Sequence, residues 1–189
     1  LIDTGNAPFS SSNASYRIVS GGGKTAYFDA SKMPLIKSNL KLSRRDIFQA
    51  VNILFEKAEL YRETEGVHAA ALFTTEVKPI CIVEEIGRHN SLDKAIGYGL
   101  LNGVDFNHVF LVSTGRMASE MVTKICRAGI PIAATKTAVT AEGLQIAKKY
   151  GLTLIGFVRD VGTKINTDMG VREFNKPEMK IYSYSERVG

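Results

Sequence analysis

The chain has 189 residues, 44% hydrophobic and 23% charged, which is typical of one globular domain large enough to bury a full core. No apolar run approaches the roughly 20 residues that a membrane-spanning helix needs, and the first residues lack the basic and apolar regions of a signal peptide, so we expect a cytoplasmic protein without a membrane partner. The net charge of +5 favours anionic partners such as nucleotides, although a dispersed charge of this size serves solubility equally well.

Two cysteines and three histidines offer little for a disulfide or a metal. Cys81 lies in an apolar run that predicts a strand, and Cys126 lies in a predicted helix. Neither belongs to a C-x-x-C pair, so we interpret both as small core residues in a reducing compartment. Because Cys and His are not clustered, the sequence predicts no protein-built metal site.

The chain divides into three parts. Residues 1–14, which contain Ser12-Asn13-Ala14, are predicted to be a tag or a disordered lead. Residues 15–42 follow as an N-terminal hairpin, a glycine-rich loop around Gly21-Gly22-Gly23 and a connector. The main α/β domain is expected over residues 43–189.

The main domain starts with a predicted helix and a predicted hairpin. Ser43 is a good N-cap, and Asp46 in the first turn complements the helix dipole. Apolar residues then recur at helical spacing over Ile47–Ala58, which gives the helix one core-facing side. Two strands joined by a short turn are expected over residues 68–74 and 79–85.

From residue 90 onward, helices and strands alternate. Helices are expected at 90–102, 118–128 and 140–150, and strands at 109–113, 130–134 and 152–158, with a last edge strand at 181–184. This alternation is typical of βαβ units with parallel strands, while the early hairpins make part of the sheet antiparallel. We therefore expect a mixed sheet with helices on both faces.

Ligands of open α/β sheets collect beyond the carboxyl ends of parallel strands, where helices begin. The first polar segment of this kind turns at Gly87 and opens a helix, where free N–H groups and Arg88 would favour an anion. His89 and Asp93 stand four residues apart, so the carboxylate could orient the imidazole. The alternative is that Asn90 and Asp93 only cap the helix while Arg88 and His89 are solvated.

The second segment is a strand, a tight turn and a helix that contain Ser113, Gly115 and Arg116. A glycine lets the backbone approach a ligand closely, hydroxyls beside N–H groups can hold phosphate, and the arginine can pair with it. The spacing of a Walker loop is absent. Ordinary turn chemistry explains this short motif about as well.

Two further segments reach the same edge. Residues 135–140 carry hydroxyls and a lysine, and in isolation they read better as a helix N-cap at Thr137 or Thr140. After the last parallel strand come Phe157, Val158, Arg159, Asp160, Val161 and Gly162. Arg159 and Asp160 could read a base or a ribose, or they could form a surface ion pair that contributes little.

Four stretches of the chain resemble the formate dehydrogenase accessory sulfurtransferases, the FdhD family. They are E-I-G-R-H-N-S-L-D-K at 85–94, S-T-G-R-M-A-S-E-M-V at 113–122, A-G-I-P-I-A-A at 128–134 and G-L-T-L-I-G-F-V-R at 151–159. They occur in order and at matching spacing from about Ser43 to Arg159. The resemblance thus covers most of the chain.

The resemblance implies a fold and a task. The fold would be a cytidine-deaminase-like three-layer sandwich without zinc, usually assembled as a homodimer. The task would be to receive sulfur from a cysteine desulfurase and pass it to the molybdenum or tungsten bis-pterin guanine dinucleotide cofactor of formate dehydrogenase. GDP would then be a surrogate for the guanine nucleotide part of this cofactor. Nucleic acid would not be a partner.

The resemblance also implies roles for the polar segments. Ser113, Gly115 and Arg116 would contact phosphate. Arg88 and His89, with Gly87 and Asp93 in the same segment, would lie beside the metal-pterin end. The segment Phe157 to Gly162 would contact guanine or ribose.

The sequence departs from the family pattern in two places. The family carries its sulfur on a C-x-x-C or related cysteine in an N-terminal loop, whereas the corresponding residues 18–24 keep the glycines and have no cysteine. After the last strand, Val161-Gly162-Thr163-Lys164 replaces a family-like G-R-M-N. The alternatives that stay open are a non-catalytic nucleotide-sensing or scaffold domain of the same fold, and a nucleic-acid binder, which the mixed charges do not favour.

Overall fold

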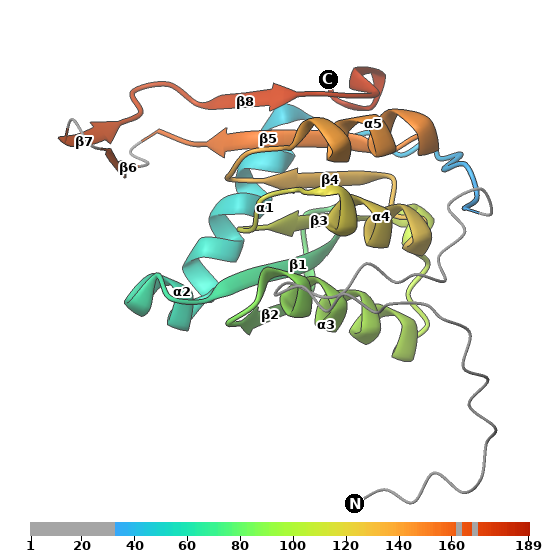
Figure 1. Ribbon diagram of the computed structural model, residues 1–189, viewed down its shortest axis with the longest axis horizontal. Helices are drawn as coiled ribbons and strands as arrows, with labels where there is room; N and C mark the ends of the chain where they lie inside the picture. The colour runs from blue at the N-terminus through green and yellow to red at the C-terminus, as the bar shows by residue number, and fades with distance from the viewer. Residues whose placement is uncertain (1–32, 162–163, 168–169) are drawn as a thin grey trace, which may run out of the picture.

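The computed structural model describes residues 33–161, 164–167 and 170–189 (Figure 1). The predicted N-terminal lead, hairpin and glycine-rich loop lie outside these residues, as does Gly162. No helix among the described residues is both long and apolar enough to cross a membrane.

The described chain folds into helices around one large sheet. The helices are α1 (Arg44–Lys57), α2 (Glu59–Thr64), α3 (Arg88–Leu101), α4 (Ser119–Ala128) and α5 (Ala141–Tyr150), with short 3-10 turns η2 (Phe106–His108) and η3 (Ser185–Arg187). The strands are β1 (His68–Thr74), β2 (Pro79–Glu85), β3 (Val109–Ser113), β4 (Ile132–Thr135), β5 (Thr153–Arg159), β6 (Lys164–Thr167), β7 (Gly170–Glu173) and β8 (Glu178–Ile181).

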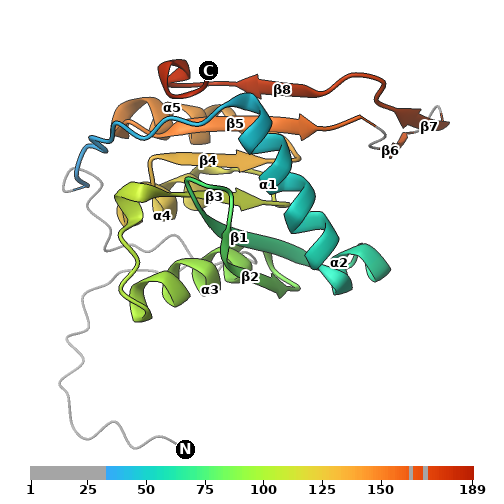
Figure 2. The same cartoon turned by 180° about the vertical axis from the view of Figure 1, so that it is seen from behind.

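Six strands form a mixed sheet in the order β2-β1-β3-β4-β5-β8, and β6 and β7 form a separate hairpin. Strands β3, β4 and β5 are parallel, and the outer pairings are antiparallel. Helices α3, α4 and α5 cover one face and α1 crosses the other (Figures 1 and 2). The expected mixed sheet with helices on both faces is therefore confirmed; the closer likeness to cytidine deaminases stays a prediction.

Local sequence explains most of the elements. Ser43 and Asp46 form a reciprocal capping box at the start of α1, as predicted, with N···O distances of 3.1 and 2.8 Å. Gly129 and Gly151 end α4 and α5 in the left-handed conformation that glycine adopts without strain. The predicted strands at 68–74, 79–85 and 109–113 have the observed bounds.

The structure corrects three boundaries. Helix α3 begins at Arg88 with Gly87 as its N-cap, so Asn90 lies inside the helix and does not cap it. Strand β4 begins at Ile132, because Pro131 has no N–H to donate. The last edge strand, β8, covers Glu178–Ile181 and precedes most of the predicted span.

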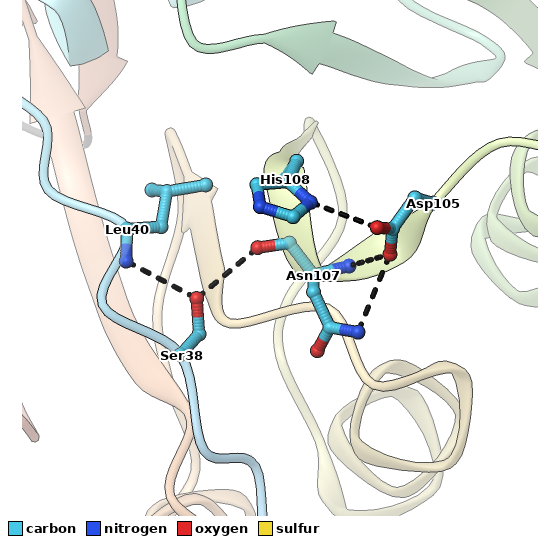
Figure 3. Close-up of polar contacts among 5 residues, drawn as sticks. All are labelled: Ser38, Leu40, Asp105, Asn107 and His108. Carbon is cyan, nitrogen blue, oxygen red and sulfur yellow. Dashed lines mark hydrogen bonds and ion pairs between the residues drawn. The ribbon is translucent and has the colours of Figure 1, made fainter.

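The connector before α1 is tied to the C-terminal end of the chain. Arg187 is buried and donates to the carbonyl oxygens of Ser38 (3.1 Å) and Gly151 (2.6 Å). Ser38 in turn donates to the carbonyl of Asn107 at 3.1 Å (Figure 3). These bonds fix the end of the sheet where β3 starts, opposite to the end where β3, β4 and β5 finish.

Candidate functional site

The polar segments meet at one edge of the sheet. Parallel strands β3, β4 and β5 end there, and their arrowheads point the same way in Figure 1. Strand β1 runs antiparallel to β3 and starts at this edge, and β2 returns to it, because His68 pairs with Glu85 and Ala70 with Ser113. The edge therefore collects the ends of β2, β3, β4 and β5 together with the start of β1.

Arg88 lies directly against the turn that follows β3. A methyl group added at Gly115 would lie 2.8 Å from the Cβ atom of Arg88, so only glycine leaves room for this side chain. The Nε atom of Arg88 and the Nε2 atom of the next residue, His89, are buried and have no hydrogen-bond partner in the described structure. Arg88 of α3 is thus placed beside Gly115 of the β3–α4 turn.

The loops after β3 and β4 are joined to each other. The hydroxyl of Thr135 donates to the carbonyl of Gly115 at 2.8 Å, and that of Thr137 donates to the carbonyl of Thr114 at 3.3 Å. The N–H of Met117 donates to the carbonyl of Ala138 at 3.0 Å. These contacts hold both loops in one rigid frame.

Ser113 lies at the end of β3, inside the turn. Its side chain is buried, and its hydroxyl accepts the N–H of Gly115 at 3.1 Å. The hydroxyl thus supports the turn, and its contact with phosphate stays a prediction. Arg116, by contrast, is exposed at the tip of the turn.

His89 and Asp93 are not hydrogen-bonded to each other. Asp93 forms an ion pair with Lys124 of α4. Burial lowers the pKa of His89, as do the charges of Arg88 and Lys124, against the opposing effects of Glu120 and Asp93. The imidazole is therefore neutral at pH 7, and of the two interpretations left open by the sequence, orientation of His89 by Asp93 is not seen.

His68 was not expected at the site. It is the first residue of β1, and its Nδ1 atom lies 3.3 Å from the hydroxyl oxygen of Thr114. Burial lowers its pKa, and so do the nearby guanidinium groups of Arg88 and Arg116. A second neutral imidazole thus faces the two site arginines.

The end of β5 carries an aromatic and guanidinium stack. Phe157 has a left-handed φ of 53° and donates its N–H to the carbonyl of Thr137 at 3.0 Å. The guanidinium carbon of Arg159 lies 5.1 Å from the ring centre of Phe157 and 4.8 Å from that of Phe174. Burial and the neighbouring Arg172 lower the pKa of Arg159, and its Nε atom is also buried without a partner in the described structure.

The remaining residues of this segment differ in exposure. Val158 is fully buried in the core beneath α1 and is not available to a ligand. Asp160 accepts from the side-chain amide of Asn52 at 2.7 Å and from the N–H of Val161, so it does not form the alternative ion pair with Arg159. Val161 is exposed, and Gly162 lies outside the described residues.

Two more features adjoin this segment. A cavity of about 640 Å³ is lined by Arg44, Phe157, Arg159, Pro177, Glu178, Met179 and Lys180. Lys136, which follows β4, holds its ammonium 4.1 Å from the ring centre of Phe55 on α1, and burial lowers its pKa. Cations thus outnumber carboxylates around the end of β5.

The two cysteines are buried or half-buried, and both thiols have raised pKa values. Cys126 is fully buried in α4, and burial raises its pKa to about 12. Cys81 is half-buried in β2, and burial raises its pKa as well. No group of three or more His, Cys, Asp or Glu side chains within the described ranges is arranged to hold a metal ion.

The arrangement suits a large anionic ligand with a planar ring. Arginines and two neutral imidazoles surround the turn after β3, and an aromatic and guanidinium stack follows β5. Comparison with known proteins shows similar chains. A model of the FdhD/NarQ family matches residues 6–189.

Two similar curated proteins are named sulfur carrier protein FdhD. The one from Methanothermobacter thermautotrophicus is 37% identical over 153 residues, 81% of this chain and 54% of its own length. The one from Bacillus subtilis is 34% identical over 149 residues, 78% of this chain and 56% of its own length. The chain thus spans about half the length of the curated relatives it matches.

A solved structure is also similar. It is described as a formate dehydrogenase accessory protein from Desulfotalea psychrophila, and it superimposes with a TM-score of 0.69 at 27% sequence identity. The match covers 84% of this chain and 60% of that one.

Proposed function

The chain belongs to the FdhD/NarQ family, and from this premise we propose that it is a formate dehydrogenase accessory protein that binds the bis-pterin guanine dinucleotide cofactor at the carboxyl ends of β2, β3 and β5. The cofactor is cargo here, held while its molybdenum or tungsten receives sulfur from a cysteine desulfurase. Formate dehydrogenase then receives the cargo.

The observation that carries this proposal is a set of three buried side-chain nitrogens without a partner. In the described part of the chain, these are Nε of Arg88, Nε2 of His89 and Nε of Arg159, and all three belong to the candidate site. A buried polar atom without a hydrogen bond costs about 1–3 kcal/mol. Protein atoms cover these nitrogens in the free chain, so an anion would pair with them only after the side chains turn toward it, and binding would then relieve this cost.

The two ends of the site match two parts of a nucleotide. Arg88 and Arg116 would hold phosphate oxygens at the turn after β3, and Phe157 with Arg159 would hold the planar ring. Strands lie about 4.8 Å apart in a sheet, so β3 and β5, which flank β4, are separated by about 10 Å. That separation is on the scale of one nucleotide.

The cysteines support a holding role more than a sulfur-carrying one. Attack on a persulfide needs a thiolate, whereas Cys81 and Cys126 are held in the thiol form at neutral pH by burial. Neither thiol of the described domain is therefore suited to carry sulfur in the folded state. A homodimer stays a prediction alongside this proposal.

Calorimetric titration of GDP tests the proposal. The wild type should bind GDP saturably, and Arg116→Ala should weaken binding by about 10- to 100-fold, the range for a charge-assisted hydrogen bond. Lys37→Ala is the matched control, because it removes an equal charge from the exposed connector next to Ser38, at the opposite end of the sheet. Equal affinities for the wild type and Arg116→Ala, or no binding by the wild type, would overturn the proposal.

A further inference from the structure

We propose that His68 is a further ligand-contact residue of this site, whose imidazole donates a hydrogen bond to the bound anion and takes up a proton from solvent when the anion binds. This inference rests on the proposed function and deepens it. It adds a contact from β1 and predicts that nucleotide binding is linked to pH.

The position of His68 follows from the antiparallel pairing of β1. His68 starts β1 opposite Glu85 of β2, at the edge where β3 ends. Thr114 follows β3 directly, and its hydroxyl oxygen lies 3.3 Å from Nδ1 of His68. The imidazole is therefore beside the turn that carries Arg116.

The hydrogen bonds around Thr114 suit one tautomer of His68. The hydroxyl oxygen of Thr114 accepts the N–H of Ala69 at 3.0 Å. Its hydroxyl keeps a proton to donate, and in one tautomer of His68 the Nδ1 atom accepts that proton. In this tautomer the proton of the ring is on Nε2, which leaves one N–H of the imidazole to donate to a ligand.

The charges around His68 explain why it is neutral before a ligand binds. Arg88 of α3 and Arg116 of the β3–α4 turn both act against protonation, together with burial. Glu85, the neighbour on β2, is ion-paired with Lys94 of α3, so its negative charge is offset. A phosphate bound between the two arginines would cancel their repulsion and favour the protonated imidazole.

His89 is in a comparable field, and the experiment must separate the two. Arg88 and Lys124 oppose its protonation, while Glu120 and Asp93 favour it. The carboxylates of Glu120 and Asp93 act on His89, whereas Glu85, which pairs with His68 in the sheet register, is ion-paired with Lys94. An added anion should therefore shift His68 more than His89.

The sign of the linkage follows from these shifts. The pKa of His68 lies below its usual value of about 6.5 in the free protein and would be raised in the complex. Between the two values, the complex binds one more proton than the free protein, so affinity rises as pH falls through this window. The gain reaches at most about tenfold for each pH unit over which a whole proton is taken up.

The test is GDP titration by calorimetry in two buffers of different ionisation enthalpy, at about pH 6 and about pH 8. The wild type is compared with His68→Gln, His89→Gln and His108→Gln. His108 is the matched control, because it is the chain's third histidine and lies beside Asp105 at the opposite end of β3 (Figure 3). The proton equilibrium of GDP itself is common to all four proteins and drops out of their differences.

We expect His68→Gln to take up less proton than the wild type at about pH 6, and to lose more GDP affinity relative to the wild type at about pH 6 than at about pH 8. His108→Gln should match the wild type at both. GDP binding with unchanged proton uptake in His68→Gln would overturn this inference and leave the proposed function standing. Absence of GDP binding by the wild type at both pH values would overturn the proposed function, and the inference with it.

Proton NMR of the wild type gives a second readout that needs no variant. With three histidines in the chain, each ring signal can be followed separately. The signal of His68 should titrate at a higher pH when GDP is present, while that of His108 stays in place. Identical titration of His68 with and without saturating GDP would also overturn the inference.

Discussion

Gly115 decides how closely two elements of the site approach each other. The side chain of Arg88 fills the space that a Cβ atom at Gly115 would need, because that atom would lie 2.8 Å from the Cβ atom of Arg88. Gly115→Ala should therefore displace Arg88, destabilise the protein by about 1–3 kcal/mol as an overpacked substitution, and weaken GDP binding about tenfold or more. Chemical denaturation and GDP titration measure the two effects.

Gly97→Ala in α3 is the control for this substitution. A Cβ atom there meets nothing within 4 Å, and alanine in a helix interior is favoured over glycine by about 0.5–1 kcal/mol. The variant should be slightly more stable and bind GDP like the wild type. If both alanine variants kept wild-type affinity, the contact between Arg88 and Gly115 would have no part in binding.

Neither cysteine should form a persulfide in the folded protein. Because burial raises the pKa of Cys126 to about 12 and also raises that of Cys81, incubation with a desulfurase and cysteine should leave neither labelled with persulfide. Mass spectrometry after alkylation of persulfides reads the result, and the urea-unfolded chain, which alkylates at both thiols, is the control. A persulfide on either cysteine of the folded chain would assign sulfur transfer to this domain.

At the scale of the elements, local patterns predict what local interactions decide. The capping box at Ser43 and the glycines that end α4 and α5 are readable because a few neighbouring residues satisfy the helix ends. The start of α3 could not be predicted in this way, because Asn90 offers an equally good cap. Arg88 is helical there while packed against Gly115, a contact that sequence spacing does not show.

The same limit applies to the site. Gly87, Arg88, Gly115 and Arg116 are predictable, since the carboxyl ends of strands share one edge. The place of His68 at the site could not be predicted, because His68 begins a strand. Only the antiparallel pairing of β1 with β3 brings the start of β1 to the site. The β6–β7 hairpin was not predicted either, because strands of four residues are too short to show a clear apolar period.

Over the whole molecule, the question is whether the net charge or its local arrangement attracts the ligand. The chain carries 24 Lys and Arg against 19 Asp and Glu, a small excess that would act alike on every face if it were spread evenly. Four cations, Arg88, Arg116, Lys136 and Arg159, lie at the carboxyl ends of the parallel strands. The opposite end holds Lys37, Arg187 and the His108–Asp105 pair.

The salt dependence of GDP binding separates these cases. The Debye screening length falls from about 10 Å at 0.1 M to about 3 Å at 1 M salt. GDP affinity should therefore fall several-fold between about 0.05 and 0.5 M NaCl, while the affinity for uncharged guanosine should show no such loss. Arg116→Ala should flatten the dependence, because it removes a charge next to the phosphate. Lys37→Ala should not, although it lowers the net charge equally. If both variants flattened it alike, the net charge of the protein would be the attraction, and the cations at the strand ends would have no special role.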